Sequence, residues 1–136
     1  MRLAVPGVPR AQGSKRHVGG GVMVEMGGKP LKDWRRDIKE SAAEMDVEPL
    51  SGALKLTMDF YMTRPKGHYG KKGLLPSAPS VPAVRPDIDK LARAVMDSLT
   101  GIWFRDDAQI ASLVCRKHYA DDSHRTPGVT VELEAL

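Results

Sequence analysis

The sequence contains a single cysteine, few aromatic residues and no long hydrophobic run. With Cys115 alone, no disulfide bond can form within the chain, which fits the reducing cytoplasm. Aromatic residues make up only 5% of the chain, so we expect an aliphatic core with methionine filling the gaps. Proline and glycine interrupt the apolar residues at the N-terminus, so we expect neither a signal peptide nor a membrane span. These absences indicate a soluble, cytoplasmic protein.

The length of 136 residues suits one domain with one hydrophobic core, and no repeat or linker divides the chain. The net charge of +4 favours a polyanionic partner such as nucleic acid. A mildly basic surface also occurs in proteins without such a partner. Charge alone therefore leaves both possibilities open.

Hydrophobic periodicity gives the order strands, helix, strand, helix, strands. The strand from Leu54 is the clearest, because its apolar residues alternate strictly with Lys55, Thr57 and Asp59. Glycine is expected to end the second helix at Gly101. The predicted strands are Leu3–Val8, Val22–Met26, Leu54–Met62, Ile110–Tyr119 and Val129–Leu133, and the predicted helices are Leu31–Met45 and Ile88–Thr100.

Residues 64–86 break this pattern. They contain five prolines, three glycines and no acidic residue, which predicts a flexible basic loop without regular elements. Such a loop could order over phosphate groups, or it could be a tolerated surface insertion. The candidate DNA-binding residues lie in this loop, in the Gly-rich segment near the N-terminus and beside the loop: Lys15, Arg16, Arg64, Lys66, Lys71, Lys72, Arg85 and Lys90.

Acidic residues concentrate between Arg85 and Ile110. Asp87 stands at or near the start of the predicted helix, where its carboxylate could accept backbone N–H bonds, and Asp89 follows two residues later. Asp89, Arg93 and Asp97 are spaced by four and so share one flank of the helix. A paired acid, Asp106–Asp107, then precedes the next strand.

The carboxylates of Asp87, Asp89, Asp106 and Asp107 would converge if the helix and the strand packed side by side. Oxygen ligands of this kind suit Mg²⁺, which could assist phosphodiester hydrolysis. The residues also allow a purely structural interpretation. Asp87 would then cap the helix, Arg93 would join an ion-pair ladder, and the paired acid would form a turn.

The segment from Arg85 to Ile110 resembles the signature of RusA-type crossover-junction endodeoxyribonucleases. The matching pieces are PDID, the helix end DSLTG and FRDDAQI, in the family's order and spacing. Lys90 stands where the family usually has asparagine, and Arg93 stands where it has lysine. Arginine keeps the charge but not the compact ammonium geometry.

The resemblance implies a single small α/β (α+β) domain, with a mixed sheet and two main helices, that forms a homodimer. It implies resolution of Holliday junctions or other branched DNA by paired nicks with Mg²⁺, for which Mn²⁺ could substitute. Asp87, Asp89 and Asp107 would be catalytic metal ligands, Asp106 a possible one, and Arg93 a catalytic cation. The alternatives are a non-catalytic DNA-binding module, such as a phage regulatory or architectural factor, and a metal-dependent nucleotide hydrolase.

Overall fold

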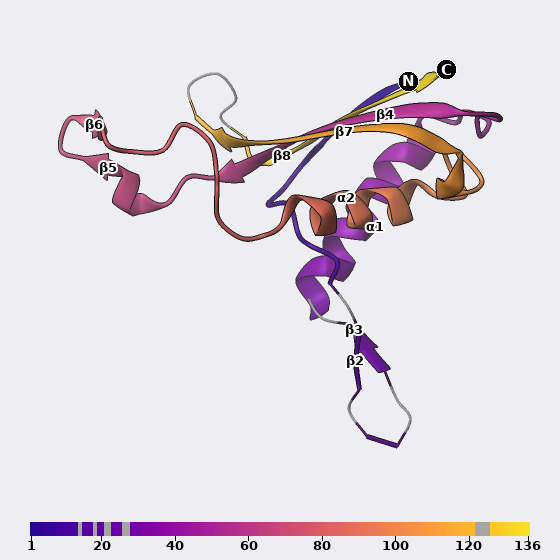
Figure 1. Cartoon of the computed structure of the whole chain (residues 1–136), viewed down its shortest axis with the longest axis horizontal. Coiled ribbons are helices and arrows are strands. Elements are labelled where there is room, and N and C mark those ends of the chain that lie inside the picture. Colours follow the sequence, from indigo (N-terminus) through magenta and orange to yellow (C-terminus); the bar gives the residue numbers. More distant parts are fainter. Residues whose placement is uncertain (14, 18, 21–22, 26–27, 122–125) are drawn as a thin grey trace.

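In the computed structural model of the chain, the structure describes residues 1–13, 15–17, 19–20, 23–25, 28–121 and 126–136. They form a four-stranded sheet with both helices packed against one of its faces (Figure 1). The sheet contains β1 (Arg2–Pro6), β4 (Leu54–Thr63), β7 (Ile110–Ala120) and β8 (Gly128–Ala135), and the helices are α1 (Gly28–Glu44) and α2 (Ile88–Leu99). None of the helices in these ranges is long and apolar enough to cross a membrane.

The strand order is β1-β8-β4-β7. β8 pairs antiparallel with both β1 and β4, whereas β4 and β7 run parallel, so the sheet is mixed. Parallel neighbours need a long crossover, which here carries α2 across the sheet from the end of β4 to the start of β7. As a result, α2 and β7 run in opposite directions (Figure 1).

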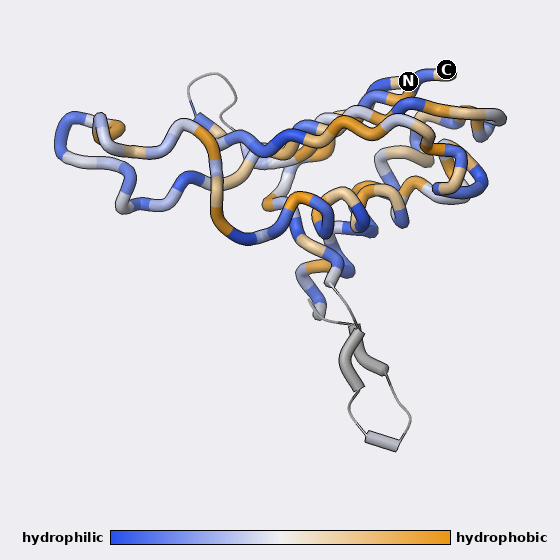
Figure 2. Tube along the Cα trace, in the orientation of Figure 1, coloured by the Kyte–Doolittle hydropathy of each residue, from blue (hydrophilic) through white to orange (hydrophobic). Residues whose placement is uncertain are grey.

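The core lies between the sheet and the two helices. Alternate residues of β4 are buried, which places its apolar side chains against the helices and leaves the polar ones on the open face. Figure 2 shows the apolar stripe of α2 turned toward the sheet. The largest fully buried side chains are Trp103, Phe60, Phe104, Leu31, Ile38, Leu54, Leu56, Met58, Leu91, Leu99, Leu133 and Val95.

The predicted α+β fold, with a mixed sheet and two helices, is confirmed. The prediction for residues 64–86 was wrong in one respect, because this segment contains a short 3₁₀ turn (Lys66–His68) and a hairpin formed by β5 (Tyr69–Gly70) and β6 (Gly73–Leu74). A further hairpin joins β2 (Lys15–His17) and β3 (Met23–Glu25), of which only β3 was expected. Residues 122–125, which connect β7 to β8, lie outside the described residues.

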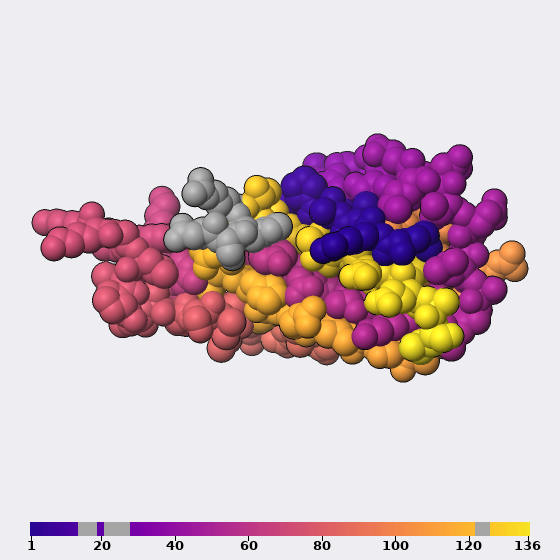
Figure 3. All heavy atoms as spheres, turned by 90° about the horizontal axis from the view of Figure 1, so that it is seen from above, coloured from indigo at the N-terminus to yellow at the C-terminus, as the bar shows by residue number. Residues whose placement is uncertain are grey.

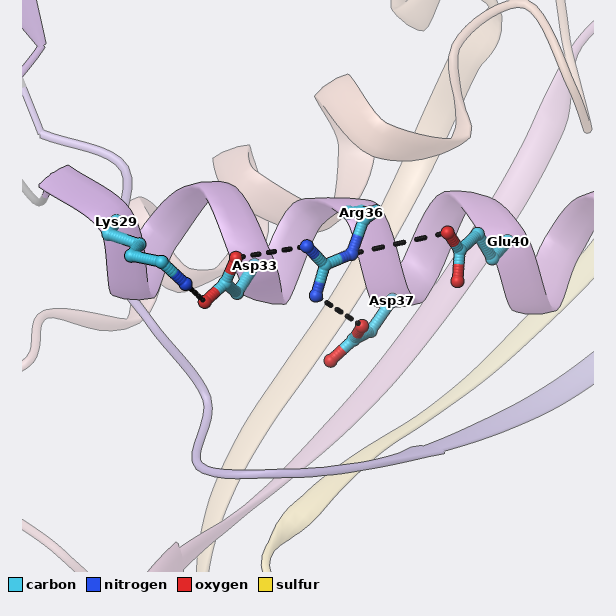
Figure 4. Close-up of polar contacts among 5 residues, drawn as sticks. All are labelled: Lys29, Asp33, Arg36, Asp37 and Glu40. Atoms are coloured by element: carbon cyan, nitrogen blue, oxygen red, sulfur yellow. Dashed lines mark hydrogen bonds and ion pairs between the residues drawn. The ribbon is translucent and has the colours of Figure 1, made fainter.

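The charged face of α1 is held together by ion pairs (Figure 4). Asp33 accepts from Lys29 at 2.8 Å and from Arg36 at 3.1 Å, and Arg36 also lies 3.5 Å from Asp37. The hydrogen bond from Lys29 lowers the pKa of Asp33. Exposed pairs of this kind contribute little to stability, so these charges mainly solvate the helix, as its sequence pattern predicts.

We expect Gly128→Ala to destabilise the fold, because a Cβ atom at Gly128 would lie 2.4 Å from the carbonyl oxygen of Val5 on the paired strand β1. Relieving this overlap requires backbone movement, which should cost about 1–3 kcal/mol of unfolding free energy. Gly67→Ala is the matched control, since a Cβ there meets no atom within 4 Å. Urea unfolding of both variants tests this, and equal midpoints would contradict it.

Candidate functional site

A groove of about 570 Å³ opens where the chain enters α2. One wall is the N-terminal segment Val8–Ala11, and the other is formed by residues 85–87 and Lys90. Arg10, Arg85 and Lys90 give this groove three cationic side chains beside the carboxylate of Asp87. Arg10 was not among the residues singled out from the sequence, because nothing in the local pattern around Pro9 links it to the distant acidic segment.

The acids at the start of α2 are exposed and almost free of partners. Asp87 is the N-cap residue, as predicted, but its carboxylate makes no capping hydrogen bond, so that part of the prediction was wrong. Its Oδ2 instead lies 3.5 Å from Nζ of Lys90. Asp89, in the first turn, is exposed and forms no hydrogen bond or ion pair with any described residue. Both carboxylates are therefore available to an incoming cation.

The start of α2 is fixed to the sheet by Lys117 on β7. Its Nζ donates to the carbonyl oxygens of Val84 at 2.7 Å and Pro86 at 2.9 Å. On the other side of the groove, the backbone N–H of Gln12 donates to the carbonyl oxygen of Lys90 at 3.0 Å. These bonds hold the acids in a defined position relative to the end of β7.

The ion-pair ladder of the structural interpretation is absent from the described residues along the flank of α2. Arg93 is exposed and forms no ion pair there with Asp89 or Asp97. The carboxylate of Asp97 instead accepts a hydrogen bond from the side-chain amide of Gln12. The guanidinium of Arg93 is therefore free to meet an anion.

The paired acids lie at the other end of α2, just before β7. Asp106 accepts from the backbone N–H of Ala108 at 2.9 Å, while the side-chain oxygen of Gln109 accepts from the N–H of Asp106 at 3.1 Å. The amide nitrogen of Gln109 then donates to the carbonyl oxygens of Leu50 and Gly52, which anchors the turn. Asp107 is exposed and forms no hydrogen bond or ion pair with the described residues. The turn that the structural interpretation expects at the paired acid is thus observed, with Asp106 as its cap.

The structure does not bring all of these acids together within one chain. Asp107 precedes Ile110 at the start of β7, whereas Asp87 follows Pro86, which is bonded to Lys117 near the end of that strand. The strand from residue 110 to 117 spans roughly 23 Å. No three His, Cys, Asp or Glu side chains among the described residues are close enough to hold a metal ion. The prediction that the four carboxylates converge within one chain was therefore wrong, because α2 and β7 run in opposite directions.

We expect Asp106→Ala to lower stability by about 1 kcal/mol, because it removes the acceptor that caps the turn Asp107–Gln109. Asp107→Ala, one residue away and equally exposed, should leave the melting temperature almost unchanged. Thermal unfolding of the two variants measures this difference. A lower melting temperature for the Asp107 variant alone would reverse the assignment.

The candidate DNA-binding residues fall into three groups. Arg64 is buried, and its guanidinium bonds to Pro79, His68 and Asp121 and stacks on Tyr119, so it anchors the loop and is removed from the candidate DNA contacts. The exposed cations of the hairpin and groove remain, namely Lys66, Lys71, Lys72, Arg85 and Lys90. The side chains of Lys15 and Arg16 lie outside the described residues.

A polar cluster on the open face of the sheet escaped the sequence analysis. Asp59 accepts from Nε of Arg116 at 2.7 Å and lies 2.7 Å from Nε2 of His118. The bond from Arg116 lowers the pKa of Asp59, so the cluster stabilises the fold at neutral pH and weakens as pH falls through that lowered value. Strand alternation predicts the face of each residue, but the parallel register that pairs Asp59 with Arg116 is a long-range feature.

The thiol of Cys115 lies between the sheet and the helices and is half-buried. Burial raises its pKa to about 11, so the thiol stays neutral at physiological pH. Cys115 therefore serves as a small packing residue against the core.

The chain is a small α+β protein with a mixed sheet and both helices on one face. Its groove combines one carboxylate with three cations, which suits a polyanion. A comparison with models of protein families matches residues 5–134 to the family described as endodeoxyribonuclease RusA. The match covers nearly the whole chain, so this protein belongs to that family and is a nuclease by class. The family implies Holliday junction resolution. A search of curated proteins finds no significant match.

Proposed function

We propose that this protein is a Mg²⁺-dependent endonuclease that resolves four-way DNA junctions by paired nicks, in recombination and repair. The groove at the start of α2 carries the proposal, because it combines an exposed acid with three cations. A phosphodiester needs cationic partners for its oxygens, whereas carboxylates repel it unless a cation lies between them. A site with both kinds of side chain therefore suits a nucleic acid together with a divalent metal ion.

Asp87 and Asp89 would hold the metal ion. Mg²⁺ usually takes one or two protein carboxylates and fills its other positions with water and phosphate oxygens, so two exposed acids two residues apart at the start of α2 are a fitting donor set. Mn²⁺ prefers the same oxygen ligands and could substitute. When bound, the ion supplies positive charge to a phosphodiester that is attacked by water. The third proposed ligand, Asp107, is not part of this set within one chain.

The cations of the groove would bind and orient the DNA backbone. Arg10, Arg85 and Lys90 line the groove and can each neutralise a phosphate. Arg93 lies on the same helix, one turn beyond Asp89, where its free guanidinium would stabilise charge on the reacting phosphate. Lys117 would act indirectly, by holding the carbonyl of Pro86 and so the position of Asp87.

The β5–β6 hairpin would contact a duplex arm away from the cut. It projects beyond the end of the sheet (Figure 1), and it bears or adjoins Lys66, Lys71 and Lys72, all exposed. These lysines would bind phosphates without reading bases. Lys15 and Arg16, on β2, are proposed to make similar contacts.

Nicking of labelled DNA tests the proposed function. A four-way junction and a linear duplex of the same sequence are incubated with Mg²⁺, with Mn²⁺ and with EDTA. We expect nicks in two opposing strands of the junction with either metal, and none with EDTA or in the duplex. A junction that is bound but never cut would indicate a non-catalytic DNA-binding module instead.

A further inference from the structure

The segment that follows β1 carries a buried polar side chain onto α2. The chain leaves β1, which lies beside β8 at one border of the sheet (Figure 3), and runs past α2 on the face that the helices cover (Figure 1). Gln12, in this segment, is only 9% exposed. Its backbone N–H donates to the carbonyl oxygen of Lys90 at 3.0 Å, and its side-chain nitrogen donates to the carboxylate of Asp97. Because Asp97 lies about two turns beyond Lys90, Gln12 spans one flank of α2.

Arg93 lies on this same flank, between the two residues that Gln12 bonds. Residues four apart on a helix are neighbours, so Arg93 can reach Asp89 one turn before it and Asp97 one turn after it. Among the described residues it pairs with neither of them, and its side chain is exposed. Asp89 would be occupied by the proposed metal ion, and Asp97 is occupied by Gln12. Gln12 therefore binds the neighbouring carboxylate that the metal ion would leave free.

We propose that Gln12 is a positioning residue for the nuclease reaction, which holds the carboxylate of Asp97 and so keeps the guanidinium of Arg93 free for the reacting phosphate. This inference rests on the proposed function, because it concerns the cation that would stabilise charge on that phosphate. Gln12 itself contacts neither DNA nor metal ion in this proposal, since its side chain is buried and directed at Asp97.

The bond between Gln12 and Asp97 matters to both residues. The side-chain oxygen of Gln12 is buried and has no partner among the described residues. Burying an amide costs free energy unless it forms hydrogen bonds, so the bond to Asp97 is the side-chain contact that offsets this cost. Asp97 is half-buried, and without Gln12 its carboxylate would lose this donor. An unsatisfied acceptor is costly, so the carboxylate would then turn to Arg93, the cation one turn away.

Single-turnover nicking of a four-way junction tests this proposal. Gln12→Met replaces the amide by an apolar side chain of similar length, which fills the buried position but cannot donate. At saturating protein the nicking rate should fall about threefold, because only molecules with an unpaired Arg93 react at the parental rate. Adding Asp97→Asn should restore a near-parental rate, because asparagine carries no charge that could neutralise Arg93. Junction binding in EDTA should be similar in all three proteins.

The combination of Gln12→Met with Asp37→Asn is the matched control. It has the same net charge as the rescued variant, but Asp37 lies on α1, away from Arg93. This control should stay as slow as Gln12→Met alone. A parental rate for Gln12→Met overturns the proposal, and so does a failure of Asp97→Asn to restore the rate. Recovery in the Asp37 control as well would show that net charge sets the rate, which also overturns it.

Chemical labelling of Arg93 tests the same contact without any measurement of nicking. Phenylglyoxal reacts with free guanidinium groups, and mass spectrometry measures the extent of reaction at Arg93 without metal or DNA. We expect slower labelling in Gln12→Met than in the parent protein, and parental labelling once Asp97→Asn is added. Asp89 is unchanged in all three proteins, so it affects them equally. Equal labelling in all three overturns the proposal. A parent protein that cuts no junction would instead refute the proposed function, whereas the labelling result would stand.

Discussion

Asp89→Asn is expected to lower the nicking rate on a four-way junction about 100-fold or more. Losses of this size follow when a group that stabilises the charge of a transition state is removed. Asparagine keeps the size of the side chain but removes the negative charge that would hold Mg²⁺. Asp89 is exposed and unbonded, so the substitution should leave the melting temperature unchanged. Because the asparagine side chain does not repel phosphate, the variant should bind the junction as tightly as the parent protein or more tightly. Asp87→Asn should behave in the same way.

Single-turnover nicking and gel-shift binding in EDTA separate these effects, and titration calorimetry with Mg²⁺ measures the metal site directly. Asp97→Asn is the matched control. It removes a charge from the same helix, but its carboxylate accepts from Gln12 away from the proposed ligands, and an amide oxygen can still accept. We expect near-parental nicking from this control. If Asp89→Asn cut the junction as fast as Asp97→Asn, Asp89 would not be a metal ligand.

Replacing Lys66, Lys71 and Lys72 together by alanine should weaken junction binding and reduce its dependence on salt. Each lysine that neutralises a phosphate releases counterions, so the slope of log affinity against log salt should become shallower by roughly 2–3. All three side chains are exposed, so the change should leave the fold intact. Nicking at saturating protein should persist, because the hairpin lies away from α2 (Figure 1), and the proposed metal ligands Asp87 and Asp89 are at the start of that helix.

Binding at several salt concentrations measures this slope. The control replaces Lys32 and Lys39 by alanine, since these lysines are exposed on α1 and are expected only to solvate the helix. Their loss should leave the slope almost unchanged. If the hairpin variant kept the parental slope, the hairpin would not contact DNA. If the α1 control changed the slope as much, the DNA path would cross α1.

The sequence by itself determined the local features of this protein. Period-two alternation located β4, and helical spacing located α1 and α2, because each element buries one face against the core. The positions of Asp87 at a helix start and of Asp106 in a capped turn also follow from short-range chemistry. The spacing of PDID and DDAQI was specific enough to indicate the family, which the match over residues 5–134 confirmed.

Only the tertiary structure decided which ends of these elements meet. The parallel pairing of β4 with β7 requires α2 to run back across the sheet, and this separates Asp107 from Asp87. The burial of Arg64 depends on Pro79 and Asp121, which are distant in the chain. The periodicity of hydrophobic residues shows which face of a helix or strand is buried. It does not show in which direction that element runs relative to its neighbour. Long-range strand pairing sets that direction. The pairing must satisfy the backbone hydrogen bonds of the sheet and also leave one face on which both helices are buried.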